Sequence, residues 1–268
     1  MIPVHAKTEV LDLKTKSFVS GLYSLSNKKL KNKTVFVLEN LSVCFKKHKS
    51  SFYGLKNVCL SLGQSDVLGV VGGSGSGKTT LGRVLCGLEK NYSGSFSASG
   101  LFLKNSVQMV YQDPFSSFNP KHTVGSSVLE VVDVFKSNHS VLNLFKVVGL
   151  DSSFINRFPH ELSGGEKQRV SIARVLASNP RVIVFDESLS ALDTETQYSL
   201  LNLIYFINII FNIAVVFISH DINSVSFLCK KIIVFRDGKI VDSFLNKNMF
   251  SKNRNFYTKK LINDALFV

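Results

Sequence analysis

The chain has 268 residues, of which 45% are hydrophobic, and a length of this size predicts one large domain or one domain with a small subdomain. Only 19% of the residues are charged, while 22 Phe and 7 Tyr supply material for a core, so the composition excludes a disordered chain. Four widely spaced cysteines without a C-x-x-C pair exclude a disulfide framework and a zinc site, and we interpret them as buried thiols of a reducing compartment.

The first predicted elements are two strands followed by a loop and a helix. Alternating apolar and polar residues predict antiparallel strands over 35–45 and 55–62, each with one face in water. The run 67–71 is continuously apolar, which is typical of a buried parallel strand. A Gly-rich segment covers 72–77, and helical spacing follows over 78–88.

The rest of the chain alternates between strands and helices. A moderately polar helical pattern over 123–160 favours a small helical subdomain at about 115–165. A hairpin turn is indicated by Arg236-Asp237-Gly238. Further strands are predicted at 106–111, 181–185, 231–235 and 239–244. This alternation predicts an α/β fold with a mostly parallel core.

One segment is long enough to suggest a membrane span. Residues 197–219 carry no charge over 23 residues. Three asparagines within the segment, and the lack of a flanking charge pattern, argue against insertion. We predict instead a buried helix over 194–211, closed by Asn212, and a buried strand over 213–219. At the N-terminus, charged residues interrupt every apolar run, so we expect no signal peptide.

The net charge of +13 is concentrated at the two ends of the chain. Residues 1–34 carry seven Lys against two acids, residues 230–268 carry nine basic residues against three acids, and the part between them is nearly balanced. Basic termini can bind nucleic acid. We favour solvated ends that aid solubility or lie near anionic lipid. We therefore predict a basic N-terminal arm over 1–34 and a basic C-terminal tail over 246–268.

A phosphate-binding motif lies between the predicted strand at 67–71 and the helix that follows. Its pattern is G-x-x-x-x-G-K-[ST], and backbone N–H groups of such a loop turn toward phosphate oxygens at a helix N-terminus. We expect Lys78 to contact the β- and γ-phosphates of ATP and the Thr79 hydroxyl to bind Mg²⁺. The expected nucleotide-binding residues here are Gly72, Gly73, Ser74, Gly75, Ser76, Gly77, Lys78, Thr79 and Thr80.

Two acidic residues end the strand predicted at 181–185. A buried strand that ends beside the phosphate loop would supply Asp186 as a ligand for Mg²⁺ and its waters. Glu187 would then orient or deprotonate an attacking water. The alternative is a strand that meets a helix N-terminus, where the two acids interact with the helix dipole. The neighbouring phosphate loop favours the catalytic interpretation.

A second anion-binding helix start is predicted at LSGGEKQR, residues 162–169. One ATP does not need two such ends in one subunit, whereas a dimer could place each nucleotide between the loop of one chain and this segment of the other. With this segment the sequence closely resembles the ATP-binding cassette (ABC) family, whose signature motif is LSGGQ or LSGGE. The resemblance implies an ABC ATPase domain over 35–245. Its P-loop NTPase (RecA-like) core is mostly parallel and carries an antiparallel β subdomain and a small helical subdomain.

The resemblance also implies roles for single residues. Gln112 matches the Q-loop glutamine that senses Mg²⁺ and nucleotide, and His220 matches the switch histidine on the γ-phosphate. Asp193, in Ser190-Ala191-Leu192-Asp193, matches the D-loop that contacts the opposite subunit. The implied nucleotide contacts from the opposite subunit are Ser163, Gly164, Gly165, Glu166 and Asp193.

An aromatic side chain is expected to stack on the adenine ring. Phe45 matches the family position for it. Phe52 or Tyr53 could take this role instead, and Phe45 would then be an ordinary strand residue.

Two segments indicate a branch of the family. YQDPFSSFNP, residues 111–120, resembles the FQDPxxSLNP of the oligopeptide, dipeptide and nickel importers. Tyr257-Thr258-Lys259 resembles their C-terminal His-Pro-Tyr-Thr, although Asn255-Phe256 stands in place of His-Pro. The resemblance implies an ATP-hydrolysing subunit that powers an importer of peptides, nickel or metal-chelating small molecules by ATP-driven dimerisation.

The resemblance implies cofactors, partners and a location as well. The cofactors are ATP and Mg²⁺. The partners are a second ABC ATPase subunit, identical or paralogous, separate transmembrane permease subunits and a substrate-binding protein, with no nucleic acid. The chain is expected peripherally at the cytoplasmic face of the cell membrane. The alternatives are the ATPase subunit of an ABC exporter and a non-transport ABC ATPase that acts on nucleic acid.

Overall fold

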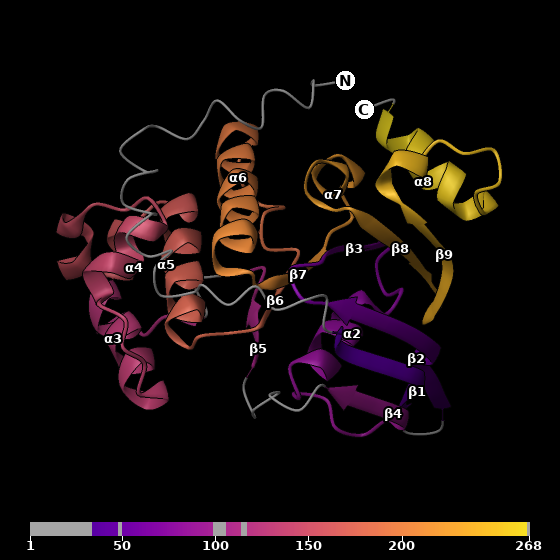
Figure 1. Ribbon diagram of the computed structural model, residues 1–268, viewed down its shortest axis with the longest axis horizontal. Helices are drawn as coiled ribbons and strands as arrows, with labels where there is room; N and C mark the ends of the chain where they lie inside the picture. The colour runs from indigo at the N-terminus through magenta and orange to yellow at the C-terminus, as the bar shows by residue number, and fades with distance from the viewer. Residues whose placement is uncertain (1–33, 48–49, 99–105, 114–116, 267–268) are drawn as a thin grey trace.

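The computed structural model describes residues 34–47, 50–98, 106–113 and 117–266 (Figure 1). The arm predicted over 1–34 lies outside these residues apart from Thr34. The described residues form a three-stranded sheet with the order β2-β1-β4 and a six-stranded sheet with the order β5-β6-β7-β3-β8-β9. Helices pack against the larger sheet, which confirms the predicted α/β fold.

The smaller sheet is antiparallel and contains one strand that hydrophobic patterning misses. β1 (Thr34–Lys47) pairs with β2 (Ser50–Gly63) and with β4 (Ser93–Ala98), so the strands predicted at 35–45 and 55–62 are confirmed and extended. β4 has the sequence SGSFSA, in which only Phe96 offers a large apolar side chain. Its ring lies edge-on to that of Phe36, and the two ring centroids are 6.0 Å apart. Pairing with β1, and not an apolar pattern of its own, therefore makes this segment a strand.

The central sheet is parallel except at one edge. Its strands are β3 (Val67–Gly72), β5 (Val107–Val110), β6 (Val182–Asp186), β7 (Ala214–Ile218), β8 (Lys231–Arg236) and β9 (Lys239–Leu245). β8 and β9 form the predicted hairpin and pair antiparallel. Because β3, β6 and β7 are adjacent and parallel, their carboxyl ends meet at one edge of the sheet. Ligands of open α/β sheets bind at this edge.

Each face of the central sheet is buried by a different layer. One face packs against α5 (Gly164–Ala177), α6 (Thr194–Phe211) and α7 (Ile222–Leu228). The other face packs against α2 (Lys78–Leu85) and the antiparallel sheet. α2 is shorter than the predicted helix over 78–88, because Gly87 takes a positive φ of 69° after it and Leu88 is 50% exposed.

A group of helices lies at one end of the molecule, beside α5 (Figure 1). It consists of α3 (Val124–Phe135), α4 (Val141–Val147) and the short 3₁₀ turns Ser152–Asn156 and Pro159–Glu161. Phe145 and Val148 anchor it, since both are fully buried in the core that α5 shares. These elements fall within the helical subdomain that the sequence predicts at about 115–165.

The uncharged segment 197–219 is split between two elements, as predicted. α6 ends at Phe211, Asn212 adopts the left-handed conformation at φ 52°, and β7 follows in the middle of the sheet. Asn208, buried in α6, donates from Nδ2 to the carbonyl oxygens of Ser65 at 3.0 Å and Ile213 at 2.8 Å. Among the residues that the structure describes, no helix is both long and apolar enough to cross a bilayer.

Two expectations about side chains and termini need correction or refinement. Only Cys229 is fully buried, whereas Cys86 is half-buried and Cys44 and Cys59 are exposed, on the sides of β1 and β2 opposite the buried Val43 and Val58. Within the tail predicted over 246–268, the structure has a 3₁₀ turn at Asn246–Asn248 and a helix, α8 (Phe256–Leu266). α8 lies beside the β8–β9 hairpin (Figure 1). Thr258 and Ile262 of this helix are buried.

Candidate nucleotide site

The loop between β3 and α2 passes very close to neighbouring backbone. Gly72 and Gly77 take φ values of 154° and 108°. A Cβ at either position would lie 2.3 Å from a carbonyl oxygen, that of Phe235 or that of Gly54. Both positions therefore require glycine, and the loop keeps a tight path that leads into the N-terminus of α2.

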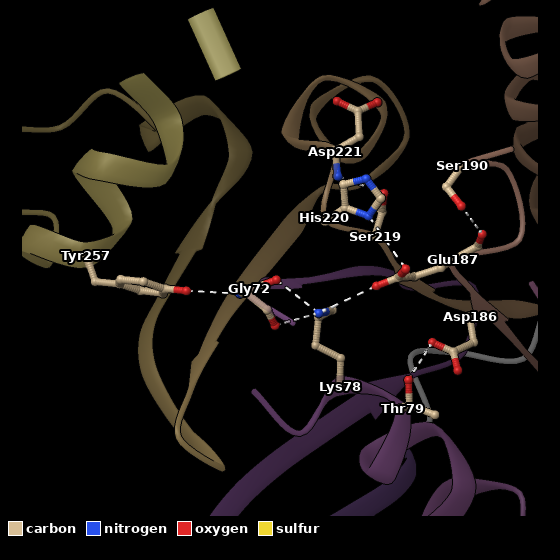
Figure 2. Close-up of polar contacts among 11 residues, drawn as sticks. Gly72, Lys78, Thr79, Asp186, Glu187, Ser190, Ser219, His220, Asp221 and Tyr257 are labelled. Atoms are coloured by element: carbon tan, nitrogen blue, oxygen red, sulfur yellow. Dashed lines mark hydrogen bonds and ion pairs between the residues drawn. The ribbon is translucent and has the colours of Figure 1, made fainter. Parts of the chain in front are cut away.

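Lys78 lies folded back inside this loop (Figure 2). Its side chain is only 4% exposed, and its Nζ donates to the carbonyl oxygens of Gly72 and Gly73, both at 2.9 Å. The same Nζ lies 3.6 Å from Oε1 of Glu187. The ammonium group is thus held at the mouth of the loop, where a phosphate oxygen could replace one of its partners.

Asp186 and Thr79 form a second pair at the same edge. The Thr79 hydroxyl donates to Oδ1 of Asp186 at 3.2 Å, and Asp186 is 7% exposed (Figure 2). Burial raises the pKa of the Asp186 carboxyl, the hydroxyl of Thr79 and the charge of Lys78 oppose this, and Glu187 adds to it. A buried carboxylate beside a hydroxyl suits Mg²⁺, which proteins hold through one or two carboxylates together with substrate phosphates.

Glu187 has a left-handed backbone and reaches toward two basic side chains. Its φ is 47°, and its N–H donates to the carbonyl oxygen of Ile218 at 3.0 Å. Oε2 lies 3.6 Å from Nδ1 of His220, on the side away from Lys78 (Figure 2). The Ser190 hydroxyl donates to the Glu187 carbonyl oxygen at 2.9 Å. Such backbone outliers persist where surrounding contacts hold them, and they cluster at functional sites.

The loop and these acids line one cavity of about 370 Å³. Gln112, from the segment after β5, lines it as well, and so do Phe52 and Tyr53 from β2. The loop residues that line it are Ser74, Gly75, Ser76, Gly77, Lys78, Thr79 and Thr80. Among the described residues, no acceptor meets the amides of Ser74, Gly75 and Gly77. The cavity therefore combines free N–H donors, an ammonium group and carboxylates, the chemistry of a phosphate and metal site.

The LSGGEKQR segment lies at a different cavity. Ser163 caps α5, because its hydroxyl accepts from the N–H of Glu166 at 3.3 Å while Glu166 Oε2 accepts from the N–H of Ser163 at 2.7 Å. A Cβ at Gly165 would lie 2.5 Å from Cγ2 of Thr196, so α5 and α6 begin in close contact there. A cavity of about 240 Å³ at this point shares no lining residue with the loop cavity. Within one chain, Ser163 and Lys78 therefore serve different surfaces.

Asp193 plays a local part in the segment that precedes α6. It caps α6 by accepting from the N–H of Thr196 at 2.9 Å, and this backbone hydrogen bond lowers the pKa of its carboxyl. Gly164, at the start of α5, lies in the same region, since a Cβ there would meet Leu192 at 3.2 Å. The predicted D-loop and signature residues are thus neighbours on one face.

Comparison with known proteins identifies the family. The model of the ABC transporter family matches residues 55–190, half of the chain. This chain belongs to the ABC transporter family. The oligopeptide transport ATP-binding protein OppF of Lactococcus lactis subsp. lactis is 34% identical over 235 residues, which cover 81% of this chain and 74% of that protein. The dipeptide transport ATP-binding protein DppF of Lactococcus lactis subsp. cremoris is 34% identical over 86% of this chain and 80% of its own length.

A solved structure agrees with the fold and the activity of this ABC protein. The dimeric ATP-binding cassette MJ0796, in a post-hydrolysis state with ADP and Pi, aligns with a TM-score of 0.69 and 28% identity. The match covers 82% of this chain and all of that one. The chain is accordingly a P-loop ATP hydrolase that binds ATP, and the family resemblance drawn from the sequence is confirmed.

Three aromatic side chains lie near the loop cavity of this ABC protein, and they differ in exposure. Phe52 and Tyr53 are 54% and 51% exposed and line the loop cavity, whereas Phe45 does not line it. Phe45 packs instead behind Phe52, with ring centroids 5.4 Å apart. A flat base would meet Phe52 or Tyr53 before it met Phe45. Phe52 and Tyr53 thus lie where the two alternatives require them, and which of the three rings stacks on adenine stays a prediction.

Two residues of the site escaped the sequence analysis. Gln168 of α5 is buried, and its Nε2 donates to the carbonyl oxygens of Ser188 and Tyr111, the second at 3.3 Å. It thereby ties the signature helix to the residues next to Glu187 and Gln112. Tyr257 of α8 contacts the phosphate loop directly. The only sequence signals were the position of Gln168 inside the motif and the partial tail match that includes Tyr257.

Proposed function

We propose that this chain is the ATP-hydrolysing subunit that drives a membrane importer of peptides. The observation that supports an energy-coupling role most directly is the grouping of Lys78, Thr79, Asp186 and Glu187 around one cavity while Ser163 lies at another. Each chain therefore contributes the loop side of one nucleotide site and the Ser163 side of another. A dimer in which each ATP lies between the loop of one subunit and the Ser163 segment of the other completes both.

In this proposal the residues of the loop cavity divide the work. Lys78 and the free loop amides hold the β- and γ-phosphates. Thr79, Asp186 and Gln112 would hold Mg²⁺, which would neutralise charge on the phosphates. Glu187 accepts a proton from the water that attacks the γ-phosphorus, the bond to the bridging oxygen breaks, and ADP leaves. His220, 3.6 Å from Glu187, contacts the γ-phosphate.

The Ser163 segment supplies the opposite side of each site. Ser163, Gly164, Gly165 and Glu166 start α5, and the N-terminus of this 14-residue helix favours negative charge. Asp193 contacts the partner cassette in this arrangement. ATP then joins the two subunits, which are identical or paralogous, and hydrolysis separates them. Separate permease subunits receive this motion at the cytoplasmic face of the membrane, as the family resemblance implies.

The substrate class rests on the relatives. The two Lactococcus lactis proteins are named for oligopeptide and dipeptide transport, and both match more than four fifths of this chain. YQDPFSSFNP supports the same branch, although residues 114–116 within it lie outside the described residues. We therefore propose peptides as the cargo, delivered by a substrate-binding protein. Nickel and metal chelates, which the branch also includes, become outcomes of the test.

A transport assay tests this assignment. In cells that carry the gene, Glu187→Gln should abolish uptake of short labelled peptides and leave uptake of labelled nickel unchanged, because the motor loses hydrolysis. Glu39→Gln, an exposed change of the same chemistry on β1, should retain peptide uptake. If the variant lost nickel uptake and kept peptide uptake, nickel and not peptides would be the cargo. Peptide accumulation in the variant would indicate an exporter.

The basic composition provides a test of the nucleic-acid alternative. We expect the ATPase rate of the purified chain to be the same with and without DNA or RNA at physiological salt, since non-specific phosphate contacts weaken steeply as salt rises. The rate is measured with duplex DNA, single-stranded DNA and RNA in parallel. A several-fold stimulation that does not depend on sequence would contradict the transport assignment.

A further inference from the structure

Tyr257, at the start of α8, contacts the phosphate loop from the side opposite Glu187 (Figure 2). Its hydroxyl oxygen accepts a hydrogen bond from the N–H of Gly73 at 2.9 Å, across 184 positions of sequence. A Cβ at Gly73 would lie 3.1 Å from the same oxygen, so the small residue leaves room for the contact. The loop is therefore attached to the C-terminal helix at its second residue.

The start of α8 is itself fixed to the central sheet through Asp242 of β9. Arg254 Nη1 donates to Oδ1 of Asp242 at 3.1 Å, and the N–H of Asn255 donates to Oδ2 at 3.0 Å. Both side chains of the ion pair are largely buried. The guanidinium group of Arg236, from β8, lies 5.1 Å from the centre of the Tyr257 ring. Contacts from two strands thus determine where the Tyr257 hydroxyl lies.

The loop needs such support because it forms the wall between two cavities. Ser74, Gly75 and Ser76 line the candidate ATP cavity, and they also line a cavity of about 440 Å³ on the α8 side. On that side the loop is held at two points, by Tyr257 at Gly73 and by the hairpin turn at Ser76. There the N–H of Gly238 donates to the Ser76 carbonyl oxygen at 2.9 Å. Between these two ties the loop faces the cavity on the α8 side.

We propose that Tyr257 is a positioning residue for the phosphate loop. Its hydroxyl engages the amide of Gly73 and so holds the following amides toward the phosphates of ATP. This inference rests on the proposed function, in which the loop binds ATP. It also gives the C-terminal Tyr257-Thr258 pair a role, because Thr258, the next residue in the same turn of α8, is 1% exposed.

The proposal predicts a defined change in Tyr257→Phe, which removes one oxygen and keeps the ring beneath Arg236. A loop that is only partly in the binding conformation lowers apparent affinity in proportion to that fraction. The dissociation constant and KM for ATP should rise about 2- to 10-fold, the range of one net hydrogen bond. Turnover at saturating ATP should not change, since bound phosphates restore the loop. Exchange of the Gly73 amide without nucleotide should become faster.

The experiment combines nucleotide titration, steady-state ATPase kinetics and hydrogen exchange of the loop on the purified full chain. Tyr92→Phe is the matched control, because this exposed tyrosine follows the far end of α2, and the control should behave as the native protein. Lys78→Ala is measured in parallel. Weaker ATP binding with unchanged turnover and faster Gly73 exchange in Tyr257→Phe supports the proposal.

Other outcomes overturn it and separate it from the proposed function. Native affinity in Tyr257→Phe, together with lost binding in Lys78→Ala, overturns the positioning role alone. A lower thermal midpoint at native affinity does the same, since Tyr257 then only stabilises α8. A fall in turnover at native affinity also contradicts it. Native binding in Lys78→Ala removes the proposed ATP site and the positioning role with it.

Discussion

Replacing Glu187 by Gln is expected to lower ATP hydrolysis about 10²- to 10⁴-fold, or roughly 3–5 kcal/mol in the barrier, while ATP still binds. The change keeps the size of the side chain and one oxygen but removes the carboxylate that lies between Lys78 and His220. The phosphate contacts of Lys78 and Thr79 remain. One negative charge near the γ-phosphate disappears, so affinity for ATP should be retained or increased.

The same variant should reveal the shared site, because ATP that is bound but not hydrolysed keeps the two cassettes together. Size-exclusion chromatography with ATP and Mg²⁺ should show the variant as a dimer, alone or mixed with its partner cassette. Glu39→Gln on β1 serves as the control and should hydrolyse ATP normally. Normal hydrolysis by the Glu187 variant would exclude this residue as the base. An inactive variant that stays monomeric with its partner would count against the shared site.

The grouping of the loop, Asp186 and Glu187 could be predicted from the sequence for a physical reason, whereas the role of His220 came from the family resemblance. Each of the first three lies at or just after the end of a strand whose continuous apolar run indicates burial between neighbouring strands. Parallel neighbouring strands bring their carboxyl ends to one edge, so residues over 100 positions apart, such as Thr79 and Asp186, come within 3.2 Å. Local patterns with a known period therefore carry this part of the site.

The parts that could not be predicted depend on contacts without a local pattern. β4 is a strand because β1 offers it an edge, and its serine-rich sequence has no apolar alternation. The choice among Phe45, Phe52 and Tyr53 depends on the register of β1 against β2, which places Phe45 opposite Phe52. The contact of Tyr257 with Gly73 depends on how the C-terminal helix docks, which charge content alone does not indicate.

Replacing Lys78 by Ala should abolish nucleotide binding or hydrolysis and leave the fold intact. Lys78 gives the loop cavity its ammonium group, and removing one member of a buried, hydrogen-bonded charge pair costs about 2–5 kcal/mol, or roughly 30- to 5,000-fold in affinity. The fold should survive because, among the described residues, the polar contacts of its Nζ are with the loop carbonyls of Gly72 and Gly73 and with Glu187, all within the site. Circular dichroism should therefore remain native.

The control for this charge is Lys90→Ala, which removes an exposed lysine beyond the far end of α2 and should change neither binding nor hydrolysis. Titration with a fluorescent ATP analogue separates a loss of affinity from a loss of turnover, and phosphate release measures the latter. Because Lys78 also lies 3.6 Å from Glu187, its removal leaves that carboxylate with His220 as its basic neighbour within 4 Å among the described ion pairs. If Lys78→Ala bound and hydrolysed ATP at the native rate, the ammonium group would have no part in phosphate binding, and the assignment of the loop would be wrong.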